Sequence, residues 1–117
     1  MRQGARTPEE LESLLEDAFV IRDREALVEL FEDGAVLVGG HGGSEARGGD
    51  EIGRWAREMW AHDRTYLADP RRVLQARDTG LVLTPYGVSV ARRGSDGAWR
   101  YAIALLSRDD TTPEEER

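Results

Sequence analysis

Two histidines, His41 and His62, are the side chains of this chain that could exchange protons near neutral pH. An imidazole has an unperturbed pKa of about 6.5 and can therefore act as a general base or acid. His41 lies within a glycine-rich stretch, 39–49, and we predict it as the candidate catalytic residue; a loop histidine without a catalytic role is the alternative. His62 falls at the end of a predicted helix, where a cation is favourable. The two histidines lack metal-ligand spacing, so we expect no metal site.

Other kinds of covalent chemistry are excluded by composition. All sixteen basic residues are arginine and there is no cysteine, so Schiff-base amines, thiolate nucleophiles, disulfides and thiolate metal sites are absent. Residues 43–48 match the start of a phosphate-binding loop, but Gly49 and Asp50 replace its lysine and hydroxyl residue. No G-x-S-x-G elbow occurs. We therefore expect no cofactor.

Length and charge indicate one acidic globular domain spanning residues 1–117, with flexible tails at 1–6 and 109–117. The net charge of -7 would repel a phosphate backbone, so we expect no nucleic-acid partner. No apolar run approaches the ~20 residues that a membrane span needs. The absence of cysteine fits a cytoplasmic location.

Three helices are predicted in the first half. Thr7-Pro8 begins the first, whose apolar stripe turns the acidic residues Glu12, Glu16 and Asp17 away. Asp23 caps a shorter second helix that carries Leu27, Leu30 and Phe31 and ends at Asp33-Gly34; residues 35–38 follow as a buried strand. Asp50 caps the third, with an unbroken stripe formed by Ile52, Trp55, Ala56, Met59 and Trp60.

Turn signals divide the second half into four strands, at about 71–77, 80–84, 87–93 and 98–107. A two-residue turn at Asp96-Gly97 predicts a face of bulky residues turned toward the helices: Val88, Val90, Trp99, Tyr101, Ile103 and Leu105. The reverse face then carries Ser89, Ala91, Ala102 and Ala104. Small residues on that face predict close contact with another sheet.

This order of elements resembles the nuclear transport factor 2-like superfamily, in its SnoaL-like branch. The resemblance covers about residues 7 to 108 and is carried by residues 23–31 running into 35–38, by 47–52 with Trp55, and by the closing 96–101. It implies an α+β fold: a cone-shaped, curved antiparallel sheet with three N-terminal helices on its concave side, a cystatin-like half-barrel. It also implies an apolar pocket and a homodimer through the sheet face that bears Ala102 and Ala104.

One member of this superfamily, ketosteroid isomerase, needs a carboxylate base and two oxyanion-hole donors. The resemblance places its helical tyrosine at Leu15, its base at or beside Gly40, and its protonated acid at Ser89. None of the three is kept, so we do not expect that reaction. The ionisable group near the base position is His41, which the resemblance places at the pocket mouth.

We predict Trp55, Met59, Tyr86 and Tyr101 as ligand-binding residues, because convergent polar groups on an apolar wall orient small molecules. A purely structural role in the core is the alternative for the apolar ones. The leading hypothesis is a protein that binds a small apolar or aromatic molecule, with cofactor-independent cyclase, isomerase or hydrolase-type acid–base catalysis left open. The alternative is a non-catalytic dimerisation or protein-interaction domain whose cone is filled.

Overall fold

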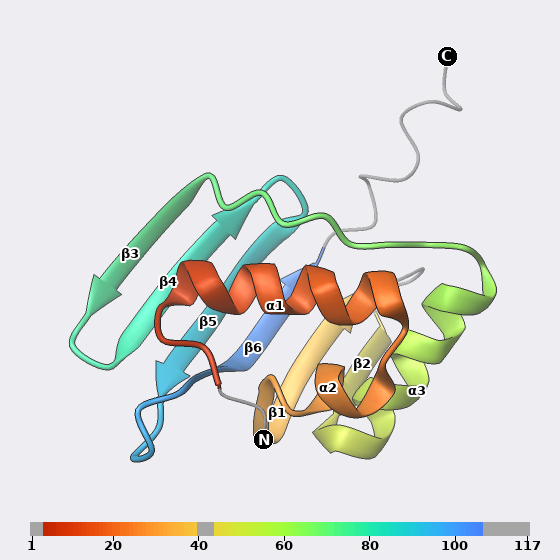
Figure 1. Ribbon diagram of the computed structural model, residues 1–117, viewed down its shortest axis with the longest axis horizontal. Helices are drawn as coiled ribbons and strands as arrows, with labels where there is room; N and C mark the ends of the chain where they lie inside the picture. Colours follow the sequence, from red (N-terminus) through yellow and green to blue (C-terminus); the bar gives the residue numbers. More distant parts are fainter. Residues whose placement is uncertain (1–3, 40–43, 107–117) are drawn as a thin grey trace.

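One curved, unclosed sheet of six strands forms the body of the protein in a computed structural model that describes residues 4–39 and 44–106 (Figure 1). The strands are β1 (Phe31–Gly39), β2 (Ser44–Arg47), β3 (Arg72–Ala76), β4 (Thr79–Thr84), β5 (Gly87–Arg93) and β6 (Trp99–Leu106). Their order is β2-β1-β6-β5-β4-β3, and neighbours are antiparallel except for the parallel pair β1 and β6. The predicted α+β class is confirmed.

Three helices are described, and α1 crosses the concave face of the sheet (Figure 1). They are α1 (Pro8–Ile21), α2 (Arg24–Val28) and α3 (Gly48–Ala61). The Thr7 hydroxyl accepts a hydrogen bond from the Glu10 amide at 3.0 Å, and the Asp23 carboxylate accepts one from the Ala26 amide at 3.1 Å. These two predicted N-caps are therefore confirmed, whereas the third, at Asp50, is wrong because Asp50 lies inside the first turn of α3.

The second helix is shorter than predicted. It ends at Val28, and Phe31 already belongs to β1. Gly34, with φ of 74°, lies inside that strand, where the register between β1 and β6 shifts. The predicted helix end at Asp33-Gly34 is wrong, because the glycine serves a strand irregularity there and does not end a helix.

Helix α3 begins at Gly48, two residues before the predicted cap at Asp50. Arg47 occupies the N-cap position without a side-chain cap, and its backbone amide donates to the Glu51 carboxylate at 2.8 Å. Asp50 and Glu51 lie in the first turn, where acidic side chains are favoured by the helix dipole.

A bulge in β6 decides which side chains face the helices. Val90 pairs with Ile103, but the next residue, Ala91, pairs with Tyr101, so Ala102 is the extra residue. Trp99 and Tyr101 are buried as predicted. Beyond the bulge the alternation reverses: Ala104 is 2% exposed and lies in the core, whereas Ile103 is 47% exposed.

The predicted faces are therefore wrong along β5 and, in β6, beyond the bulge. Ser89 pairs with Ala104 and Ala91 pairs with Tyr101, so these small residues lie under helix α1 and not on an uncovered face. A Cβ added at Gly80, the partner of Ala91, would lie 3.1 Å from the Pro8 ring. Small side chains on this face allow α1 to approach the sheet closely.

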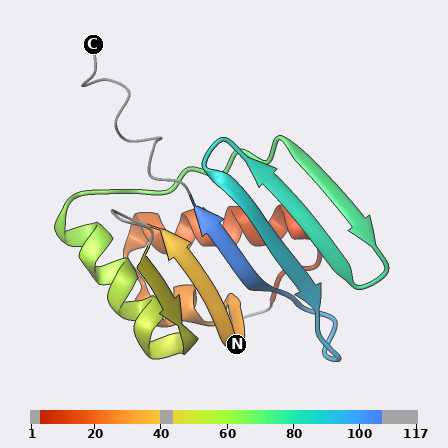
Figure 2. The ribbon, with the colours of Figure 1, turned by 180° about the vertical axis from the view of Figure 1, so that it is seen from behind.

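No described helix covers the opposite face of the sheet, which we call the outer face (Figure 2). The strand pairing places two cross-strand rows of aliphatic residues on it. The rows are Leu74-Leu81-Val90-Ile103-Val36 and Leu83-Val88-Leu105-Val38. Leu74, Leu83, Ile103 and Leu105 are exposed.

The N-terminal segment is tied to the sheet as far as it is described. Ala5 is buried and forms a bridge with Trp99, whose amide donates to the Ala5 carbonyl at 2.9 Å. Ala5, which the prediction placed in the flexible tail 1–6, is therefore packed against the sheet, whereas the predicted tail 109–117 lies outside the described residues. Among the described helices, none has the length and apolar character needed to cross a bilayer.

Gly87 offers a test of the β5–β6 packing. A Cβ at Gly87 would lie 2.0 Å from the Leu105 carbonyl oxygen, so we expect Gly87→Ala to lower the free energy of unfolding by at least about 3 kcal/mol. Gly97 is the matched control: its φ is +84° but its Cβ would meet nothing within 4 Å, so Gly97→Ala should cost about 1 to 2 kcal/mol. Urea unfolding of both variants measures the difference, and equal losses would contradict the steric account.

Candidate functional site

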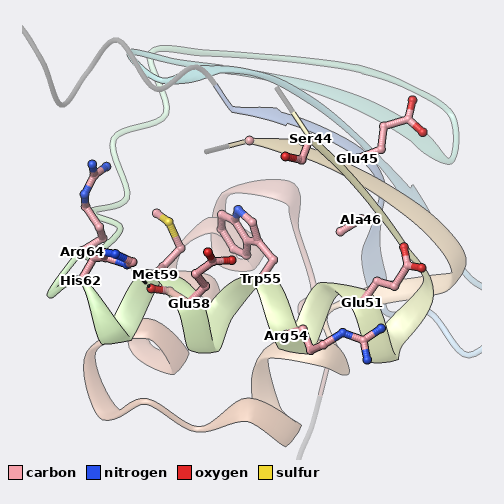
Figure 3. Close-up of a pocket in the computed structure, with 11 residues that line it drawn as sticks. Ser44, Glu45, Ala46, Glu51, Arg54, Trp55, Glu58, Met59, His62 and Arg64 are labelled. Atoms are coloured by element: carbon pink, nitrogen blue, oxygen red, sulfur yellow. Dashed lines mark hydrogen bonds between the residues drawn. The ribbon is translucent and has the colours of Figure 1, made fainter. Parts of the chain in front are cut away.

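A groove of about 600 Å³ runs between helix α3 and the β1–β2 pair (Figure 3). Trp55 and Met59 lie half-buried along it, one helical turn apart. Among the described residues, the lining is formed by Gly39, Ser44, Glu45, Ala46, Glu51, Arg54, Trp55, Glu58, Met59, His62 and Arg64. The groove therefore combines an apolar floor with a charged rim.

The helical periodicity of α3 explains why these two side chains reach the groove. Ile52, Ala56 and Trp60 follow at intervals of four and are buried, so they anchor the helix. Trp55 and Met59 lie at the flank of that stripe and remain partly exposed.

The Trp55 ring is packed between Phe19 and the end of strand β1. Its ring meets Phe19 edge-on, with centroids 5.6 Å apart. A Cβ at Gly39 would lie 3.4 Å from its indole nitrogen, so the strand passes close over the ring. That nitrogen is buried and has no hydrogen-bond acceptor within the described part of the chain.

Several rim charges are already engaged with protein groups. Glu45 forms an ion pair with Arg47 at 3.2 Å, and Glu51 accepts the Arg47 amide. The Nδ1 atom of His62 lies 3.0 Å from the Glu58 carbonyl, which agrees with its predicted place at a helix C-terminus. This bond requires a proton on Nδ1, so a neutral His62 presents Nε2 as an acceptor.

A second group of polar side chains lies inside the molecule, between α1 and the sheet. The Glu12 side chain is 1% exposed; one of its oxygens accepts the Tyr66 hydroxyl at 2.6 Å and the other accepts the Tyr101 hydroxyl at 2.5 Å. The prediction that Glu12 turns away from the core is therefore wrong. Its two phenol donors supply the partners that a buried carboxylate needs.

Burial sets the protonation of this cluster. It raises the pKa of Glu12 above the ordinary 4.5, and the hydrogen bonds from Tyr101 and Tyr66 offset part of that rise. Burial and the neighbouring carboxylate also raise the pKa of both phenols. Glu12 is consequently the member of the cluster that titrates, while the phenols stay protonated.

Tyr66 comes from residues 64–70, a segment without helix or strand that we call the strap. The strap joins α3 to β3 and passes along α1 (Figure 1). Glu16, one turn after Glu12, accepts the Ala68 amide at 2.8 Å. Two carboxylates of α1 thus fix the strap.

The structure separates the predicted site residues into two places. Trp55 and Met59 line the groove. Tyr101 belongs to the interior cluster, and Tyr86 packs against Tyr66 with ring centroids 5.1 Å apart and the rings tilted by 42°. His41, the predicted base, lies outside the described residues. No group of three or more metal-ligating side chains occurs within residues 4–39 and 44–106.

Comparison with known proteins gives the fold its context. No family model and no curated protein matches this chain, but solved structures do. A ketosteroid isomerase-like protein from Erwinia carotovora atroseptica is 21% identical, with 85% of this chain and 91% of that chain covered and a TM-score of 0.70. This chain has the cystatin-like, nuclear transport factor 2-like fold.

Two further structures share the nuclear transport factor 2-like fold of this chain. A domain of unknown function with a cystatin-like fold from Nostoc punctiforme is 15% identical, with 92% of this chain and 78% of that chain covered and a TM-score of 0.69. A putative calcium/calmodulin-dependent protein kinase type II association domain from Thiobacillus denitrificans is 18% identical, with 91% and 98% covered and a TM-score of 0.70. These identities establish the fold and leave activity open.

Glu12→Gln tests the raised pKa. The folded state holds the Glu12 proton to higher pH than the unfolded state does. The free energy of unfolding that Glu12 gains from this difference in proton binding is therefore fully present below pH 4.5, and it is lost as the pH rises through the folded-state pKa. Glutamine does not titrate. The free energy of unfolding of the wild type, relative to the variant, should therefore fall with rising pH, by up to about 1.4 kcal/mol per pH unit in that window.

Urea unfolding between pH 4 and 8 measures this difference. Glu9→Gln, at an exposed position of the same helix, controls for the loss of one acidic side chain. A difference between wild type and Glu12→Gln that does not change with pH, or the same trend in Glu9→Gln, would contradict the assignment.

Proposed function

We propose that this chain binds a small, largely apolar or aromatic molecule in the groove between α3 and the β1–β2 pair. The observation that carries the proposal is the floor of this groove, where Trp55 and Met59 lie partly exposed in a volume of about 600 Å³. Ligand sites in proteins have volumes of about 300 to 1,000 Å³ and apolar walls with a few polar groups. The ketosteroid isomerase-like description of one neighbour supports the same class of ligand.

Acid–base catalysis in this groove would need a proton carrier. Among the described lining residues, His62 has that chemistry, because its Nδ1 is held by the Glu58 carbonyl and its Nε2 is left for a ligand. The predicted base His41 follows β1, and its part in catalysis stays a prediction. Binding is therefore the first property to test.

Met59→Glu should weaken the binding of an aromatic probe. We choose 1,8-dihydroxyanthraquinone, a flat, polyketide-like molecule; the chain has no lysine or cysteine side chain that could add to a quinone. A carboxylate on the groove floor would have to be desolvated by the bound rings, so we expect affinity to fall at least about tenfold. Thermal shift and quenching of tryptophan fluorescence measure the binding.

Ile21→Glu is the control, because Ile21 is an exposed apolar residue of α1 that does not line the groove. It should bind the probe as the wild type does. Failure of the wild type to bind this and related tricyclic aromatics at high micromolar concentration, or an equal loss in both variants, would count against the groove as the site.

A second candidate function is self-association through the outer face. Its rows of aliphatic side chains span five strands, and contiguous exposed apolar surface of this kind marks interaction sites. The homodimer remains a prediction, but the residues proposed for it change: Ala104 lies in the core, so Ile103 and Leu105 replace the predicted alanine pair. A neighbour described as an association domain supports this candidate.

Ile103→Glu tests it. A charge at the centre of the outer face should convert a dimer to a monomer, because each subunit would then bury an unpaired carboxylate. Sedimentation velocity at about 10 to 100 μM measures the mass. Val20→Glu, at an exposed position of α1, should leave the mass unchanged, and a wild-type monomer throughout this range would reject the candidate.

A further inference from the structure

The side chain of Tyr66 occupies the inside of the molecule although it belongs to a segment without regular structure. It is 5% exposed. Its ring packs against Phe19 at 6.0 Å and against Tyr86 at 5.1 Å, and its hydroxyl donates to Glu12 at 2.6 Å. Tyr66 therefore makes the contacts that a bound phenol would make: aromatic walls around its ring and a carboxylate at its hydroxyl.

The groups that receive Tyr66 all come from other elements. Glu12 and Phe19 lie on α1, Tyr86 lies in the turn between β4 and β5, and Tyr101 lies on β6. Tyr101 completes the polar end, because its hydroxyl donates to the second oxygen of the same carboxylate at 2.5 Å. Removal of the Tyr66 ring would leave this receptor assembled.

The strap itself is held by few contacts. Besides the Tyr66 side chain, which meets Glu12 and Thr84, the described polar contacts of the strap are few: the Ala68 amide donates to Glu16, the Arg64 amide donates to the Met59 carbonyl, and Asp69 forms an exposed ion pair with Arg71 at 3.0 Å. Leu67, between Tyr66 and Ala68, is 53% exposed. A segment with few buried apolar contacts opens at lower free energy than the helix and strands around it.

We propose that the space filled by Tyr66 is a binding site for phenolic aromatic compounds, in which Tyr66 is the resident internal ligand. A phenol would enter when the strap moves out, would pack on Phe19 and Tyr86, and would donate its hydroxyl hydrogen to Glu12 beside Tyr101. The site differs from the groove, so this inference does not depend on the function proposed above.

Competition with Tyr66 sets the affinity. A phenol binds only molecules whose strap is displaced, so its apparent affinity for the wild type is reduced by the fraction of such molecules. Tyr66→Ala removes the competitor and leaves the receptor. We expect this variant to bind p-cresol, which is the tyrosine side chain as a free molecule, at least roughly tenfold more tightly than the wild type does.

Calorimetric titration and thermal shift of Tyr66→Ala with p-cresol and with toluene test the proposal. The two probes differ by the hydroxyl group, so p-cresol should bind about fivefold or more tightly because the hydroxyl satisfies Glu12. Phe31→Ala is the matched control. Phe31 is also a buried ring that packs against Tyr101, but it has no hydroxyl that bonds to a carboxylate. Its cavity should not prefer p-cresol.

The wild type gives an independent test that does not require a stable cavity variant. Trypsin cuts this lysine-free chain after arginine, and Arg64 and Arg71 flank the buried ring. Millimolar p-cresol should speed cleavage after Arg64 several-fold, whereas toluene should not. Met59→Glu should show the same acceleration, because the groove is a different site.

The proposal is rejected if p-cresol binds Tyr66→Ala no better than toluene does, or if the Phe31→Ala cavity shows the same preference. If Tyr66→Ala does not fold, unchanged cleavage of the wild type after Arg64 in p-cresol rejects it as well.

Discussion

One buried carboxylate joins helix α1 both to the sheet and to the strap. Glu12 takes one hydrogen bond from Tyr66 and one from Tyr101, and these tyrosines come from the strap and from β6. A buried carboxylate with a missing partner is costly, by several kcal/mol if it is charged. Tyr101 supplies the partner of one carboxylate oxygen and the strap supplies the partner of the other, so the interior is polar at its centre although its walls are apolar.

The bulge at Ala102 gives the two faces of the sheet different roles. On one side of it the large rings of Trp99 and Tyr101 fill the core; on the other, Ala104 lies below the helices and Ile103 faces outward. One extra residue therefore makes room for α1 and at the same time builds an aliphatic outer face. The bulge does not shape the groove, because the groove lies on the other side of β1, beside α3.

Much of the fold could be predicted because hydrophobic periodicity and turn residues mark helices and strands locally. The same reasoning located the groove floor at Trp55 and Met59, the flank of a helical stripe. The bulge was missed because the pairing was extended from Asp96-Gly97 without a break, and no local signal marks an extra alanine.

Glu12 is misleading for a different reason. Its position, seven residues before Phe19, lies within the apolar stripe of α1, but its residue type is typical of the surface. Helical periodicity by itself would have placed it inside. Its partners could not have been found this way, because Tyr66 and Tyr101 are 54 and 89 residues distant along the chain.

The parallel pairing of β1 with β6 determines when the protein can finish folding during its synthesis. β1 ends at Gly39, whereas β6, the strand that pairs with it in the middle of the sheet, begins at Trp99. The nascent chain must therefore keep the inner edge of β1 unpaired while more than half of the domain is translated, and contacts of such long sequence separation form slowly. Until the last strand leaves the ribosome, that edge is open to pairing with other chains.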